Sequence, residues 1–359
     1  MKIKQKNYYV RANSSQGLIN LLYSNVIGLK TGIILTGDYE FLKNDLLAAI
    51  SQFLKDSDVP TECIHSCYEP DALEGLIIRE SRIGVFSDQI MDDTTLRLFD
   101  NVMYVDMEET LSPNYPEIAD KLRDNWNKSL KDYEMAYEIF ARAIRIHDEW
   151  EKIYIDHMHF DQANQFADEF IDTLFSKDCA HEAGIARHRF FGGASYKGSK
   201  DYVMDLTDSY ETRHFIKGRP GSGKSTFMKR IQAKAEELQY EVEVYHCGFD
   251  PNSLDMILIR DLGFCIFDST APHEYFPVRK GDIVVDMYES LIDPGTDEAW
   301  KPQLDEIRSR YQAQVKAGTV CMQDGKDLQN KINLELNRYV IDEQLVKKIH
   351  EVAQMIVKE

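Results

Sequence analysis

The chain has 359 residues, 43% of them hydrophobic, a length and composition that suit a globular protein of about two domains. Its 61 acidic residues outnumber 42 basic ones and give a net charge of −19. This balance argues against a nucleic-acid partner, because a surface that binds a duplex must neutralise several phosphates.

No segment reaches the roughly 18 consecutive apolar residues that a membrane span needs. Residues 1–6 are basic, but a polar run follows where a signal peptide would need an apolar segment. The six cysteines are scattered through the chain, which is typical of reduced thiols rather than a disulfide framework. We therefore expect a cytoplasmic protein with no membrane partner.

Three potential metal ligands alternate along a predicted strand in the first half: Cys63, His65 and Cys67. Side chains two apart on a strand share a face, so these three could begin a zinc site. Alternatively, a buried strand carries the two thiols as small apolar side chains. We favour the second interpretation, because no fourth ligand stands nearby in the sequence.

Long helices are predicted at the end of each half. Apolar residues recur at steps of three or four between residues 122 and 154, which predicts a helix of roughly 40 residues, near 60 Å long. Asp161 is expected to cap a second helix. The second half repeats this plan with an interrupted helical stretch from about Glu298 and a last helix after Asp342. Each helical hairpin would serve as a buttress or as an interaction arm.

The most specific motif in the chain is G-x-x-x-x-G-K-[ST], the phosphate loop. It comprises Gly218, Arg219, Pro220, Gly221, Ser222, Gly223, Lys224, Ser225 and Thr226. Its glycines let successive backbone N–H groups converge on phosphate oxygens. Lys224 is expected to reach the β- and γ-phosphates, and the Ser225 hydroxyl to bind Mg²⁺. The sequence therefore predicts a site for a nucleoside triphosphate, ATP or GTP, with Mg²⁺.

The segments around this motif fit its requirements. A short strand is predicted at 214–216 before it, an amphipathic helix at 227–238 after it, and a further strand at 241–247. A buried strand at 262–268 ends in Asp268, our candidate for the Walker B aspartate beside the metal. Alternatively, Asp268 only caps its strand. Ser269 follows it where many such enzymes carry a glutamate, so the sequence reveals no hydrolytic base.

The chain is also an internal duplication. Sliding the sequence by 181 residues brings Gly37 onto Gly218 and Lys43 onto Lys224, and the register holds for roughly 80 residues without a gap. Other aligned pairs are Ser14 with Ser195, Gly17 with Gly198, His65 with His246, and Pro70 with Pro251. We predict two domains, a degenerate one at 1–180 and an intact one at 181–359.

The first copy has lost the features that bind phosphate. Glu40 stands where the loop needs a glycine, and like Asp38 it would repel phosphate. Asn44 replaces the metal-binding hydroxyl, and Ser87 replaces the Walker B aspartate. Only Lys43 persists. We predict that the first copy binds no nucleotide, and that it completes or regulates the site in the second.

The chain resembles a family of uncharacterised bacterial P-loop ATPases with two tandem copies of the nucleotide-binding domain. The resemblance covers nearly the whole chain and rests on the phosphate loop and on residues 245–247, 250–255 and 268–273. Ser269 stands where the family pattern has a glycine, and the degenerate first loop is a second departure. The resemblance implies an α/β fold of two tandem P-loop NTPase-like domains, each a parallel sheet flanked by helices with a C-terminal helical hairpin.

Two histidines follow the strands that end near the predicted site. His246 has a counterpart, His65, in the degenerate copy, which favours a structural role. His273 has none, and we expect it to position the nucleophile, which makes Lys224, Asp268 and His273 the candidate catalytic residues. The predicted function is an ATPase in which hydrolysis drives a change between the halves. The alternatives are a kinase with an unknown small-molecule acceptor, and a nucleotide-gated module whose arms hold a protein partner.

Overall fold

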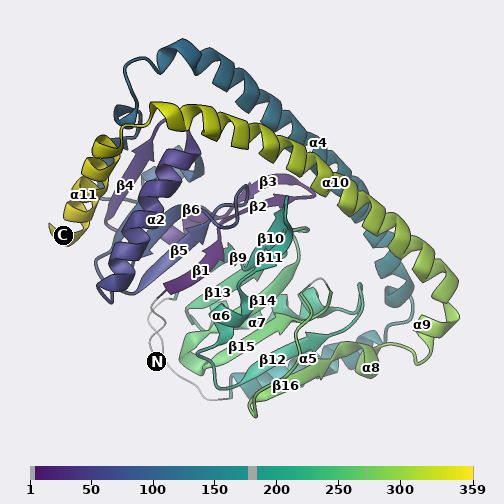
Figure 1. The fold of residues 1–359 in the computed structure, drawn as a ribbon. Helices are drawn as coiled ribbons and strands as arrows, with labels where there is room; N and C mark the ends of the chain where they lie inside the picture. The colour runs from purple at the N-terminus through teal and green to yellow at the C-terminus, as the bar shows by residue number, and fades with distance from the viewer. Residues whose placement is uncertain (1–4, 177–183, 272, 359) are drawn as a thin grey trace.

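The structure, a computed structural model, describes residues 5–176, 184–271 and 273–358. Twelve strands form one mixed sheet with helices on both faces, and two long helices, α4 (Pro116–Ile155) and α10 (Lys301–Leu336), run together along the molecule (Figure 1). The predicted α/β class is confirmed. Within the described ranges, no helix combines the length and apolar character that a membrane crossing requires.

The large sheet consists of two equivalent sets of six strands. In the first half these are β1 (Gln5–Tyr9), β4 (Thr31–Thr36), β5 (Thr61–His65), β6 (Leu73–Ile78), β7 (Ile83–Ser87) and β8 (Asn101–Asp106). In the second half they are β9 (Ala186–Phe190), β12 (Arg213–Lys217), β13 (Val242–His246), β14 (Leu254–Ile259), β15 (Phe264–Asp268) and β16 (Asp282–Asp286). Their order is β16-β12-β15-β14-β13-β9-β1-β5-β6-β7-β4-β8. The prediction of purely parallel sheets was wrong, because β6 and β14 run antiparallel to both neighbours.

The halves meet at a pseudo-twofold axis in the middle of this sheet. Strands β1 and β9 pair antiparallel through Tyr9 and Phe190, which the duplication aligns with each other. A four-stranded sheet repeats the relation, with β2 (Arg11–Ser14) joined to β10 (Gly192–Ser195) through Asn13 and Ala194. Its outer strands are β3 (Gly17–Asn20) and β11 (Gly198–Asp201). The duplication read from the sequence is thus a symmetry of the fold.

Each repeat sends its last helix onto the other repeat. Helix α5 (Phe160–Leu174) packs on α7 (Lys224–Glu237), where the rings of Phe166 and Phe170 lie 5.4 and 5.1 Å from that of Phe227. Helix α11 (Asp342–Lys358) packs on α2 (Glu40–Asp56) of the first repeat in the same way. The predicted domain boundary near residue 180 lies outside the described residues.

The long helices confirm the periodicity in the sequence. Helix α4 has 40 residues and α10 has 36, and each carries a proline in its first turn, where proline costs no hydrogen bond. The structure corrects one detail, because α5 begins at Phe160 with His159 before it, so Asp161 lies in the first turn and does not cap the helix.

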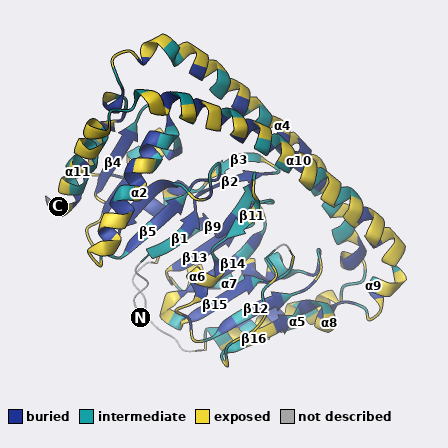
Figure 2. Cartoon of the chain, in the orientation of Figure 1, coloured by how far each residue is buried: buried dark blue, intermediate teal, exposed yellow. Residues whose placement is uncertain are grey.

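Small residues bring α4 and α10 together. A Cβ at Gly318 would lie 2.3 Å from the Phe140 ring, so only glycine allows this approach. Ala136 and Ala143 of α4 are fully buried in the same contact zone, while the outward faces of both helices are exposed (Figure 2). Short helices complete the fold: α1 (Leu22–Val26), α3 (Asp93–Leu96), α6 (Val203–Thr207), α8 (Met287–Leu291) and α9 (Thr296–Ala299).

A buried ionic network lies at the seam between the halves. The Arg189 guanidinium is 3.0 Å from the Glu62 carboxylate and 2.9 Å from that of Glu243, and it stacks 4.0 Å from the Tyr8 ring centre. The duplication aligns Glu62 with Glu243 and Tyr8 with Arg189, so one cation serves two equivalent carboxylates. Burial would raise the pKa of Glu243, but Lys6 and Arg189 lower it to about 2.

Candidate functional site

The phosphate-loop motif lies between a strand and a helix, as predicted. Strand β12 ends at Lys217 and α7 begins at Lys224, and β12 lies between β15 and β16, which both run parallel to it. Gly221 and Gly223 have φ angles of 76° and 84°, in the left-handed region that favours glycine. The loop thus stands at the carboxyl end of β12, with the N-terminus of α7 directly behind it.

Lys224 and Asp268, far apart in the sequence, lie together in this loop. Asp268 is the last residue of β15, and its carboxylate is 3.7 Å from the Lys224 ammonium. The Lys224 ammonium also donates to the Arg219 carbonyl at 2.9 Å, so the side chain bends back over the loop. Two of the predicted site residues are therefore within reach of one bound anion.

A second carboxylate, which the sequence analysis did not place in the site, joins this group. Asp255 lies on β14, next to Leu254, whose N–H donates to the Ser225 hydroxyl at 3.0 Å. Burial and the neighbouring Asp268 raise the pKa of Asp255 above its usual range. The strand that carries Asp255 was not predicted, because a short segment of mostly apolar residues gives no direction of pairing.

The oxygens around Ser225 fit a hard divalent cation. The Ser225 hydroxyl and the carboxylates of Asp255 and Asp268 are the kind of ligands that Mg²⁺ takes in proteins. Inside the loop, the Ser222 hydroxyl is buried and has no hydrogen-bond partner among the described residues. A buried polar group without a partner is costly, which fits a loop built around a polar ligand.

His273 is placed beside the same carboxylates. Its Nδ1 is 2.6 Å from the Asp201 carboxylate, and its Nε2 is 3.3 Å from the Ser199 hydroxyl. Burial lowers the pKa of His273, but Asp201, Asp255 and Asp268 outweigh it and raise that pKa overall. This shift favours the protonated ring, in which both nitrogens donate hydrogen bonds. The sequence analysis missed Asp201, which lies on β11 of the small sheet.

The beginning of the loop is held in place by residues further along the second repeat. Arg219 donates two hydrogen bonds to Asp297, at 3.0 and 2.7 Å, and its guanidinium lies 4.9 Å from the Tyr288 ring centre. Pro220 joins this anchored end to Gly221. Thr226 is exposed in the first turn of α7.

Two other histidines, His246 and His65, each contact the backbone carbonyl of a proline five residues further along the chain. The Nδ1 of His246 is 2.7 Å from the Pro251 carbonyl, and the Nδ1 of His65 is 3.1 Å from the equivalent carbonyl of Pro70. Because both copies keep this contact, it agrees with the structural role expected for His246. The Nε2 of His65 is 2.9 Å from the amide oxygen of Asn7, so both of its ring nitrogens have protein partners.

In the equivalent loop of the first repeat, the lysine is paired with groups of the protein itself. The Lys43 side chain is fully buried, with Nζ 2.5 Å from Asp88, 2.6 Å from Glu40 and 2.8 Å from the Gly37 carbonyl. Two carboxylates therefore compensate the charge that would otherwise attract a phosphate.

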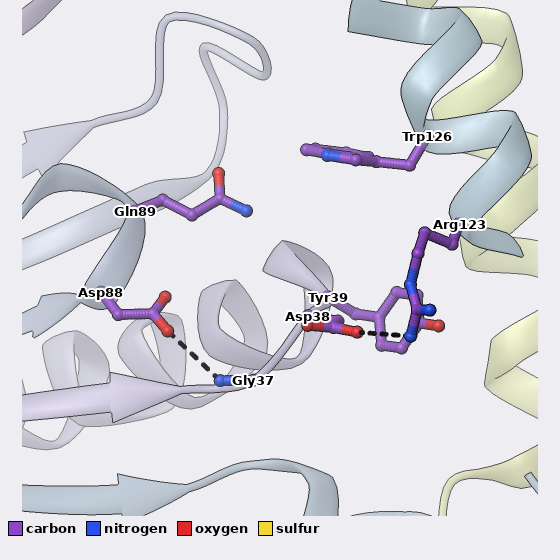
Figure 3. A pocket seen from close by; sticks show the side chains of 7 residues that line it. All are labelled: Gly37, Asp38, Tyr39, Asp88, Gln89, Arg123 and Trp126. Carbon is purple, nitrogen blue, oxygen red and sulfur yellow. Dashed lines mark hydrogen bonds and ion pairs between the residues drawn. The ribbon is translucent and has the colours of Figure 1, made fainter. Parts of the chain in front are cut away.

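A cavity of about 460 Å³ remains beside the Gly37 turn. Its lining residues are Gly37, Asp38, Tyr39, Asp88, Gln89, Arg123 and Trp126. Figure 3 shows that Arg123 and Trp126 face this turn from α4. This cavity lies at the position in the first repeat that is equivalent to the phosphate loop of the second. It is bordered by the side chains of Arg123 and Trp126, and among the described residues no tight glycine loop is present there.

Comparison of the chain with protein-family models, with curated proteins and with solved structures finds no match. Function is therefore inferred from the residues of the chain and their geometry.

Proposed function

We propose that the protein is a P-loop NTPase, with two P-loop NTPase-like repeats, that binds ATP with Mg²⁺ at residues 218–226 and hydrolyses it to drive a change between its halves. The observation that carries the proposal is the meeting of Lys224, Ser225 and Asp268 at a loop with two left-handed glycines. Glycine loop, lysine, hydroxyl and strand-end carboxylate are the parts that phosphoryl transfer requires.

Each residue has a role in this proposal. The amides of residues 218–226 and the N-terminus of α7 bind the phosphates, and Lys224 binds the β- and γ-phosphates. Ser225 and Asp268, with Asp255 beside them, would hold Mg²⁺, which when bound neutralises charge on the phosphate oxygens.

Calorimetric titration of the full chain tests this function. With Mg²⁺ present, ATP is expected to bind at one site per chain, because only the second repeat keeps the glycines of the phosphate loop, and its lysine is not buried in direct ion pairs with two carboxylates as Lys43 is. Titration with GTP identifies the base, since a guanine nucleotide that binds alone would replace ATP in the proposal. If neither ATP nor GTP binds, the proposed function is contradicted. Binding without turnover would favour the nucleotide-gated module.

His273 is expected to act on the γ-phosphate or the attacking water as a donor. Replacing it with alanine should slow hydrolysis about 100-fold, with little change in the dissociation constant for ATP, because the protonated ring would act mainly in the transition state. Asp201→Asn should lower the pKa of His273 and move the alkaline limb of the rate profile to lower pH. Single-turnover hydrolysis across pH measures both effects. Unchanged hydrolysis in His273→Ala would remove this role.

A further inference from the structure

Helix α4 of the first repeat lies directly on the phosphate loop of the second. A Cβ at Gly221 would be 2.5 Å from the backbone carbonyl oxygen of Glu151 and 3.0 Å from its Cα, so the loop touches the helix backbone. Just beyond α4, the terminal methyl group of Met158 would lie 2.9 Å from a Cβ at Gly223. The loop is therefore covered by a helix that follows the degenerate copy in the sequence.

This helix presents two titratable side chains to the loop, His147 and Glu151. Burial and Lys224 lower the pKa of His147, which favours its neutral ring. The His147 Nδ1 and the Glu151 carboxylate are 3.6 Å apart, one turn from each other on α4. Burial, Asp148 and Asp250 raise the pKa of Glu151 overall, and Lys224 and a hydrogen bond from the Gly221 N–H oppose this rise in part. A carboxylate thus faces a loop amide and the loop lysine, the same groups that a triphosphate would use.

The first repeat offers a comparison within the same molecule. Met158 pairs with Ile292 and Val340 pairs with Leu111 in equivalent bridges, which sets the register between the two arms. In this register, His147 corresponds to Gln329 and Glu151 to Asn333.

Gln329 and Asn333 line a small cavity with Tyr39 and Glu40 of the degenerate loop. At these two positions the arm therefore places neutral amides beside the degenerate loop, where Lys326 of α10 lines the same cavity, and an imidazole and a carboxylate beside the intact loop. In this register the His147–Glu151 pair has no titratable equivalent beside the degenerate loop.

We infer that Glu151, supported by His147, is a residue of the nucleotide site that competes with the bound phosphates, so that nucleotide displaces it and moves α4. The inference rests on the proposed function. Because α4 packs against α10 along most of its length, its displacement would carry both arms and so reach the first repeat. This contact gives a physical link between the triphosphate and a change between the halves.

Replacing Glu151 with alanine tests the inference. The variant should bind ATP with Mg²⁺ at least about tenfold more tightly than the original chain, because the competing carboxylate is gone. The matched control is Glu138→Ala, which removes the same charge from an exposed position further along α4 and should leave affinity unchanged. Calorimetric titration of the full chains measures all three affinities.

Tryptophan fluorescence gives an independent measure of movement. The chain has three tryptophans, and a Trp126→Phe, Trp300→Phe variant keeps only Trp150, one residue from Glu151. ATP with Mg²⁺ is expected to change the emission of Trp150, since its ring packs near His147 and Tyr311 of the two arms.

The outcomes separate this inference from the proposed function. Equal affinities of the original chain and Glu151→Ala, or equal gains in Glu151→Ala and Glu138→Ala, would overturn the inference and leave nucleotide binding established. Binding with no change in Trp150 emission would also contradict it. If neither the original chain nor Glu151→Ala binds nucleotide, the proposed function fails, and the inference fails with it.

Discussion

Lys224→Ala is expected to weaken binding of ATP with Mg²⁺ by about 100-fold or more, without unfolding the protein. Its ammonium supplies positive charge for binding the phosphates. Within the protein it donates one hydrogen bond, to the Arg219 carbonyl, and lies 3.7 Å from the Asp268 carboxylate. Calorimetric titration measures the loss, and an unchanged thermal unfolding midpoint shows that the fold is intact.

Lys43→Ala is the matched control for this experiment, because the duplication aligns the two lysines. Lys43 is fully buried between Glu40 and Asp88, so its loss leaves two carboxylates without their cation. We expect this variant to lose about 2 kcal/mol of unfolding free energy and to bind ATP as before. If Lys43→Ala abolished binding, or Lys224→Ala did not weaken it, the assignment of the live site to the second repeat would be wrong.

Arg189→Met is expected to lower the free energy of unfolding by about 3 to 5 kcal/mol, because it leaves Glu62 and Glu243 buried without their shared cation. Methionine fills a similar apolar volume, so the effect reports the charge and not a cavity. Urea unfolding followed by circular dichroism measures it. Both repeats should unfold in one transition, because the sheet is continuous across the seam.

Arg260→Ala is the control for this second prediction. The Arg260 guanidinium lies 3.8 Å from the same Glu243 carboxylate, but its side chain is 61% exposed. Pairs that water screens contribute little, so we expect a loss below about 1 kcal/mol. A similar loss in both variants would show that Arg189 is not the centre of the network.

The features that could be predicted are those encoded by local spacing. The phosphate loop is a contiguous motif, and the strand before it and the helix after it were confirmed at β12 and α7. The prediction of helix α4, which has 40 residues, was also confirmed. Apolar residues that recur at steps of three or four over so long a segment fit an α-helix and no other regular secondary structure. The loss of the first phosphate loop could be read by aligning Gly37 and Lys43 with the intact copy.

The features that could not be predicted depend on which segments meet in space. Apolar runs such as β6 and β14 are buried on both faces, and nothing in such a run states whether its neighbour is parallel or antiparallel. The same holds for Asp255 and Asp201, whose neighbours in the site, Asp268 and His273, come from the end of β15 and from the segment that follows it.

The exchange of helices has the same physical reason. An amphipathic helix such as α5 needs an apolar surface to cover, and the equivalent surfaces of the two repeats satisfy its pattern equally well. Local sequence therefore specifies the helix and its buried face. The path of α4 across the molecule selects the partner, and it is this path that brings Glu151 onto the phosphate loop of the other repeat.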